Sequence, residues 1–104
     1  MKHENDLNRI LAVCCQRFRI EEDLVRSRTH LQSVSQCRKT CMYLMRQTGA
    51  TYVSIAEFLG RDHSTIVHGV QQVEAMLRER PASERFLNEI RQEIAPRPDS
   101  WWRI

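Results

Sequence analysis

Five consecutive polar residues in the second half of the chain can form hydrogen bonds of several kinds: Arg61, Asp62, His63, Ser64 and Thr65. They follow Gly60, and the apolar face of the segment begins only at Ile66, so a core does not need them. At the start of a helix, such side chains can read base edges in the major groove, where a carboxylate accepts from an amine and an imidazole donates or accepts. The dipole and the amides at that end of a helix also favour phosphate. These residues therefore indicate nucleic-acid binding.

The positive charge of the chain is concentrated in one stretch. The net charge of +3 and the pI of about 8.9 are modest. Between Leu24 and Ala56, however, the chain has no acidic residue and has five basic ones, which are Arg26, Arg28, Arg38, Lys39 and Arg46. Such an excess suits a phosphate backbone, although a solvated helical face has the same composition. RNA is the less favoured partner because no exposed aromatic platform accompanies the stretch.

The spacing of the apolar residues predicts an all-α fold of about six helices. The helical segments are expected at residues 6–17, 20–25, 33–48 (with 35 as an alternative start), 51–59, from a cap at Asp62 or Ser64 to Pro81, and from a cap at Ser83 to residue 94. Phe86 or Leu87 should face inward in the last helix. Nothing in the sequence alternates as a half-buried strand does.

The fourth and fifth segments have the pattern of a helix-turn-helix, which is a short helix, a glycine turn and a longer helix. In that motif the first helix braces against the DNA backbone and the second presents its N-terminal side chains to the major groove. Purely structural bundles contain helix pairs of the same shape. Spacing alone therefore leaves both interpretations open.

The residues of this region resemble a known family. The run Gly-Arg-Asp-His-Ser-Thr-Ile-Val-His at residues 60–68, with the segments 54–59 and 37–44 before it, is similar to the C-terminal DNA-binding domain of the bacterial replication initiator DnaA. The similarity covers roughly residues 7–94. It implies a six-helix domain, related in fold to the Trp repressor, that binds a short A/T-rich duplex box as a monomer and without a cofactor.

The resemblance also implies roles for individual residues. The major-groove readers would be the residues that open the second helix of the motif, which are Asp62, His63, Ser64 and Thr65. The residues at the DNA backbone or minor groove would be Arg28, Arg38, Lys39, Val53, Ser54, Arg61 and His68. Arg38 corresponds to an arginine that grips phosphate, and Asp62 would also help to cap its helix. The main chain of residues 52–54 would meet the DNA backbone.

Two departures from the family pattern concern specificity. The basic loop before the third helix is longer here, over residues 26–36, so Arg28 is our candidate for the arginine that enters the minor groove, with Arg26 behind it. Many members also have proline where this chain has Val53. Either change would shift the preferred box.

The sequence contains no Gly-x-x-x-x-Gly-Lys-Ser/Thr loop, which the ATPase module of the initiator would need to hold a nucleotide. We therefore expect a protein that is not an enzyme and does not bind nucleotide. If the chain is complete, we expect a free-standing domain, from a phage or a mobile element, that acts in replication initiation or its regulation. The alternative is a protein-interaction or transcription-regulatory module that keeps the fold with weak or altered DNA specificity.

Two other kinds of site are less favoured. Cys37 and Cys41 could be combined with His63 and His68 into a zinc site, but small residues on an apolar stripe are more typical of a core. Asp62, His63 and Ser64 do not make a catalytic set, because consecutive residues at a helix start do not converge on one reacting atom.

Cys14 and Cys15 are adjacent, so we expect one in the core and the other at its flank. Cysteines within apolar stretches favour a reducing cytoplasm. The resemblance to the initiator implies a bacterial or phage-encoded protein that is associated with the nucleoid. No apolar stretch approaches the roughly 20 residues that span a bilayer.

We predict one DNA-binding domain over residues 1–95, a size that suits a single core, and a flexible tail over residues 96–104. Trp101 and Trp102 in this tail would dock a protein partner, pack back on the domain or remain disordered.

Overall fold

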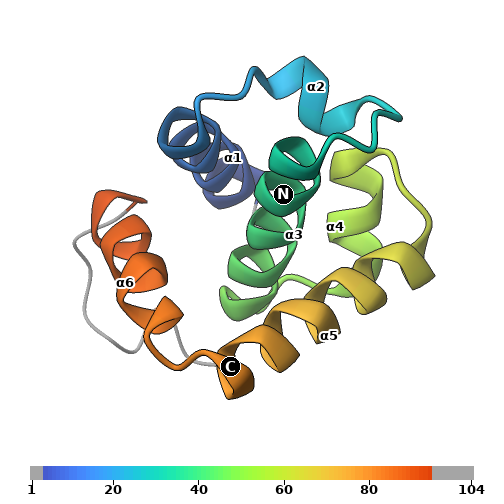
Figure 1. Ribbon diagram of the computed structural model, residues 1–104. Coiled ribbons are helices and arrows are strands. Elements are labelled where there is room, and N and C mark those ends of the chain that lie inside the picture. The colour runs from blue at the N-terminus through green and yellow to red at the C-terminus, as the bar shows by residue number, and fades with distance from the viewer. Residues whose placement is uncertain (1–3, 95–104) are drawn as a thin grey trace.

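The computed structural model describes residues 4–94, and this part of the chain forms six α-helices (Figure 1). They are α1 (Glu4–Phe18), α2 (Glu22–Arg26), α3 (Gln32–Gln47), α4 (Tyr52–Leu59), α5 (His63–Glu79) and α6 (Ser83–Ile94). Between residues 4 and 94 there is no strand. The predicted all-α architecture is therefore confirmed. The predicted tail with Trp101 and Trp102 lies outside the described residues.

Helix α3 occupies the centre of the molecule. Figure 1 shows α1 and α6 on one side of it and α4 and α5 on the other, and α3 packs closely against both α1 and α5. Because helices cover α3 from two sides, its burial is wider than one stripe. Cys37 and Cys41, which were expected on an apolar stripe, are buried, and so are Met42, Tyr43, Leu44 and Met45.

Several predicted details differ in the structure. Helix α2 begins later than predicted, at Glu22, and its Val25 is buried, whereas the neighbouring Leu24 is 41% exposed. In α6, Leu87 faces inward at 2% exposure and Phe86 is 38% exposed. Ser83 is the first helical residue rather than the cap. In these short or terminal turns the partner helix decides which of two neighbouring apolar residues is covered.

The prediction that one of the two adjacent cysteines flanks the core is wrong. Cys14 and Cys15 are both buried, because α1 is covered by α3, α2 and α6 together and therefore hides a broad arc of its surface. Burial, and then the neighbouring Cys37 thiol, raise the pKa of the Cys15 thiol to about 12. A thiol in this state is a packing group and not a nucleophile.

Helices α3 and α5 lie in close contact at Gly69. A Cβ atom built on Gly69 would lie only 2.4 Å from Met42 Sδ, and Met42 is buried in the core. Side chain and helix backbone therefore touch where α5 crosses α3. The absence of a side chain at Gly69 therefore lets α5 lie close to the central helix α3.

Replacing Gly69 by alanine is expected to lower the free energy of unfolding by about 1 kcal/mol, because the overpacking cost of roughly 1–3 kcal/mol exceeds the gain in helix propensity. Urea denaturation followed by circular dichroism at 222 nm measures the change. In a Met42→Ala background the same substitution should have no cost, since the atom it meets is gone. A stabilised Gly69→Ala protein would contradict this account of the crossing.

No helix in the described part of the chain is long and apolar enough to cross a membrane.

Candidate nucleic-acid interface

The short helix α4 has a defined start and a defined end. Thr51 caps it, with its Oγ1 accepting from the Ser54 amide at 3.0 Å. Its last turn closes at Gly60, whose φ of 68° lies in the left-handed region that glycine adopts without strain. Ile55 and Leu59 anchor it in the core. The turn that leads into α5 is therefore short and fixed.

Helix α5 begins with a row of exposed side chains. Asp62 occupies the N-cap position, and His63, Ser64 and Thr65 form the first turn, with all four side chains exposed. The first buried residue is Ile66. The prediction that the Asp62 side chain helps to cap the helix is wrong, because its carboxylate makes no capping hydrogen bond. Asp62 instead lines the groove described next.

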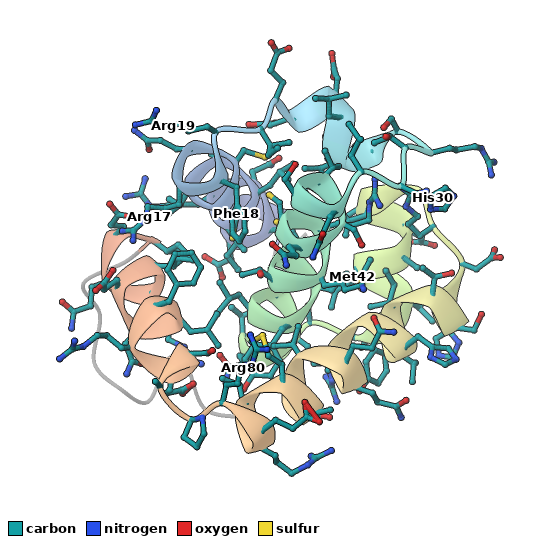
Figure 2. The ribbon with its side chains drawn as sticks, viewed as in Figure 1. Arg17, Phe18, Arg19, His30, Met42 and Arg80 are labelled. Carbon is teal, nitrogen blue, oxygen red and sulfur yellow. The ribbon has the colours of Figure 1, made fainter. Side chains whose placement is uncertain are left out.

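An open groove of about 970 Å³ lies between the α2–α3 loop, α3, α4 and the first half of α5. It brings together basic residues from distant parts of the sequence, namely Arg26, Arg28, Arg38, Lys39 and Arg61. Histidines line it as well: His30, His63 and His68. Its acidic lining consists of Glu57 and Asp62. In Figure 2, His30 lies on the side of the molecule that carries α4 and the start of α5, away from Arg17 and Phe18.

The charges of the groove are not offset by ion pairs. Within residues 6–94, the salt bridges lie on the opposite side, where Arg17 pairs with Glu89 at 2.9 Å and with Glu93 at 3.3 Å, and on α6, where Arg91 pairs with Glu84 at 3.2 Å. The basic side chains of the groove thus present an uncompensated positive field, which attracts a polyanion.

Arg38 is buried at 8% exposure, and its guanidinium faces the protein's own backbone. Its Nε donates to Val25 O at 2.8 Å and its Nη2 to Ser27 O at 3.0 Å, with longer bonds to Leu24 O and Thr29 O. Burial, and then the nearby charge of Arg61, lower the pKa of this guanidinium from its ordinary value. A direct phosphate contact by Arg38 stays a prediction.

Arg61 is half-buried and reaches the same loop from the turn between α4 and α5. Its Nη2 donates to Val25 O at 3.2 Å and also to Ser27 O. Its Nε is buried and has no hydrogen-bond partner among the described residues. The two arginines thus share two carbonyl acceptors.

The other predicted contact residues lie at the surface of the groove or on its rim. Arg28 and His68 are exposed, Lys39 is half-buried, and Val53 is 56% exposed at the start of α4. The Ser54 amide already donates to Thr51, so the amides of the first turn at residues 52 and 53 are the ones that remain for a phosphate.

Sequence reasoning did not assign four polar residues that line the groove, which are His30, Ser35, Glu57 and Gln72. Gln72 could have been found, since it follows His68 by four positions on the same helical face. Arg26 was placed behind Arg28, and the structure anchors it on α4, where its Nε donates to Phe58 O at 3.2 Å and its guanidinium lies 4.8 Å from the Phe58 ring centroid.

The residues of the rejected zinc site lie in different surroundings. Cys37 and Cys41 are fully buried in the core, whereas His63 and His68 are exposed on α5. His63 packs edge-on against the Tyr52 ring with centroids 6.0 Å apart. No group of three His, Cys, Asp or Glu residues in the described chain is arranged to hold a metal ion.

Comparison with known proteins points to one family. The family model described as the bacterial DnaA protein helix-turn-helix matches residues 7–73. Similar curated proteins are chromosomal replication initiator proteins DnaA. That of Gloeobacter violaceus is 29% identical over 83 residues, which is 78% of this chain and 19% of the relative. Those of Sphingopyxis alaskensis and Thermomicrobium roseum are 33% and 37% identical, over 67% and 66% of this chain and 16% and 15% of the relatives. The chain thus spans less than a fifth of the length of these relatives.

Proposed function

The chain belongs to the bacterial DnaA helix-turn-helix family, and from this premise we propose that it binds double-stranded DNA sequence-specifically, at an A/T-rich box of the DnaA type, in replication initiation or its regulation. The observation that carries the proposal is the groove, where five basic side chains meet the exposed row that opens α5. The basic side chains suit a phosphate backbone, and the exposed polar row suits the edges of the bases.

In the proposed complex the start of α5 enters the major groove. The reading side chains are those of the exposed row, Asp62, His63, Ser64 and Thr65. The positioning contacts come from Arg28, Lys39, His68 and the first amides of α4 at residues 52 and 53. Phosphate contacts fix the register on the duplex, and the base contacts specify the sequence.

The proposal includes a monomer on a single box, in the cytoplasm and without ATP hydrolysis by these residues. The shape of the groove supports the proposal that these residues do not hydrolyse ATP. The groove is wide, open and basic, whereas a nucleotide site encloses its ligand.

The test is fluorescence anisotropy with a duplex that carries an A/T-rich DnaA-type box and with a scrambled duplex, each at two salt concentrations. We expect a preference of at least tenfold, which corresponds to about 1.4 kcal/mol, and we expect the preference to persist at the higher salt. Such a result separates sequence reading from charge attraction, because phosphate contacts are common to both duplexes and weaken with salt, whereas the preference for one duplex depends on the base contacts.

Equal affinity for both duplexes, lost on adding salt, would contradict the proposal. It would favour the alternative module that keeps the fold with weak or altered DNA specificity. Selection from a random duplex library then decides between these two cases, because an altered reader enriches a new sequence and a sequence-blind module enriches none.

A further inference from the structure

The loop between α2 and α3 is short, and besides local hydrogen bonds of Ser27 and Thr29 it is held by two arginines from outside the loop. Arg38 and Arg61 donate to the carbonyl groups of residues 24, 25, 27 and 29, and both reach those of residues 25 and 27. Two of these carbonyls belong to the last turn of α2, whose acceptors have no partner within the helix. The guanidiniums thus close α2 and shape the loop after it.

The position of Arg28 in this loop is the decisive detail. On either side of it, Ser27 O accepts from both guanidiniums and Thr29 O accepts from Arg38. The side chain of Arg28 itself is exposed and lines the groove. The backbone is therefore fixed immediately before and after the residue whose side chain faces outward.

The two guanidiniums are held near each other without a carboxylate. None of the salt bridges found within residues 6–94 involves Arg38 or Arg61. Two like charges at one place cost free energy unless many acceptors surround them. A purely structural clamp could use a neutral donor, so the paired charge indicates a function in which a polyanion lies alongside.

We propose that Arg38 and Arg61 are positioning residues, which clamp the loop at residues 27–31 so that Arg28 is presented to the duplex. The presentation of Arg28 to the duplex rests on the proposed function, whereas the clamp on the loop does not. The clamp acts before any DNA arrives, and affinity depends on Arg61 through Arg28. A direct phosphate contact by Arg61 is the competing arrangement.

The first experiment needs no DNA. Limited trypsin digestion of the native Arg61→Met protein should cut after Arg28 about tenfold faster than in the wild type, because cleavage follows the population of the opened loop. Cleavage after Arg46, within α3, should be unchanged and controls for global unfolding. We choose Arg61 because it is half-buried, whereas removal of Arg38 would leave buried carbonyls without donors. An unchanged rate at Arg28 would overturn the positioning role of Arg61, because Arg38 still donates to the same carbonyls in this variant.

The second experiment is a double-mutant cycle on the preferred box. Arg28→Ala should weaken binding by about tenfold in the wild type and by less than twofold in the Arg61→Met background, because a released loop no longer presents Arg28. Lys39→Met is the matched control, since Lys39 lines the same groove from α3 and makes no hydrogen bond to the loop among the described residues. In that background the tenfold loss should persist.

The two experiments separate failure of the inference from failure of the proposed function. If the losses for Arg28 and Arg61 multiply, Arg61 contacts DNA directly and the positioning role is overturned. If the protein has no preferred box, the digestion still decides whether Arg61 holds the loop. Faster cleavage after Arg28 supports this role of Arg61, and equal cleavage rules it out.

Discussion

Replacing Ile66 by alanine is expected to lower the free energy of unfolding by about 2–4 kcal/mol, because the side chain is fully buried and its removal leaves a cavity in the core. Ile66 is the first buried residue of α5, directly after the exposed row at residues 62–65. Its amide donates to Asp62 O at 3.3 Å, so the residue connects the start of the helix to the core. The substitution should therefore also loosen the end of α5 that faces the groove.

Thermal and urea unfolding followed by circular dichroism measure the effect. For a domain of this size each kcal/mol corresponds to roughly 4–8 °C in Tm. Gln71→Ala is the matched control, since Gln71 is exposed on the same helix and its loss should change stability by less than about 0.5 kcal/mol. A decrease of less than about 1 kcal/mol in the free energy of unfolding for Ile66→Ala would mean that this side chain does not anchor α5 in the core.

Replacing His63 by alanine is expected to weaken binding to the preferred box by about 1–3 kcal/mol and to change binding to random duplex little. His63 is exposed at the start of α5 and lies against the Tyr52 ring, which limits the orientations of the imidazole. A ring held in this way can donate to or accept from a base edge with a small loss of entropy. Because the side chain is exposed, folding stability should not change.

The control is His68→Ala, five positions further along α5 and also exposed. His68 is proposed to contact the DNA backbone, so its loss should weaken binding to all duplexes equally. In one anisotropy series, His63→Ala should therefore lower the preference for the box, whereas His68→Ala should lower the affinity for both duplexes and leave the preference unchanged. Equal losses on box and random duplex for His63→Ala would remove His63 from the readers.

The helix-turn-helix itself could be predicted from local signals. Thr51, Gly60 and the late start of the apolar face at Ile66 specify a cap, a left-handed turn and an exposed helix start within 16 residues. These signals act over one or two turns of the chain, so the sequence alone contains them. The exposed row at residues 62–65 was predicted for this reason.

The surroundings of Arg38 could not be predicted in the same way. Its partners are carbonyl groups 9 to 14 positions earlier, in a loop whose path depends on the packing of α2 on α3. The prediction for Cys14 and Cys15 was wrong for a related reason. Periodicity identifies the apolar face of a helix but not how many neighbouring helices cover it. Both cases depend on tertiary contacts between elements and not on the elements themselves.

The pairing of α1 with α6 has a consequence for the order of folding. Arg9 donates to the carbonyls of residues 93 and 94, and Arg17 pairs with Glu89 and Glu93, so these contacts join residues 72 to 85 positions apart. Closing so long a loop has a larger entropic cost than joining α3, α4 and α5, which follow one another through short turns. The α3–α5 part of the groove can therefore be assembled before the outer helices meet, and docking of α6 on α1 is the step that completes the domain.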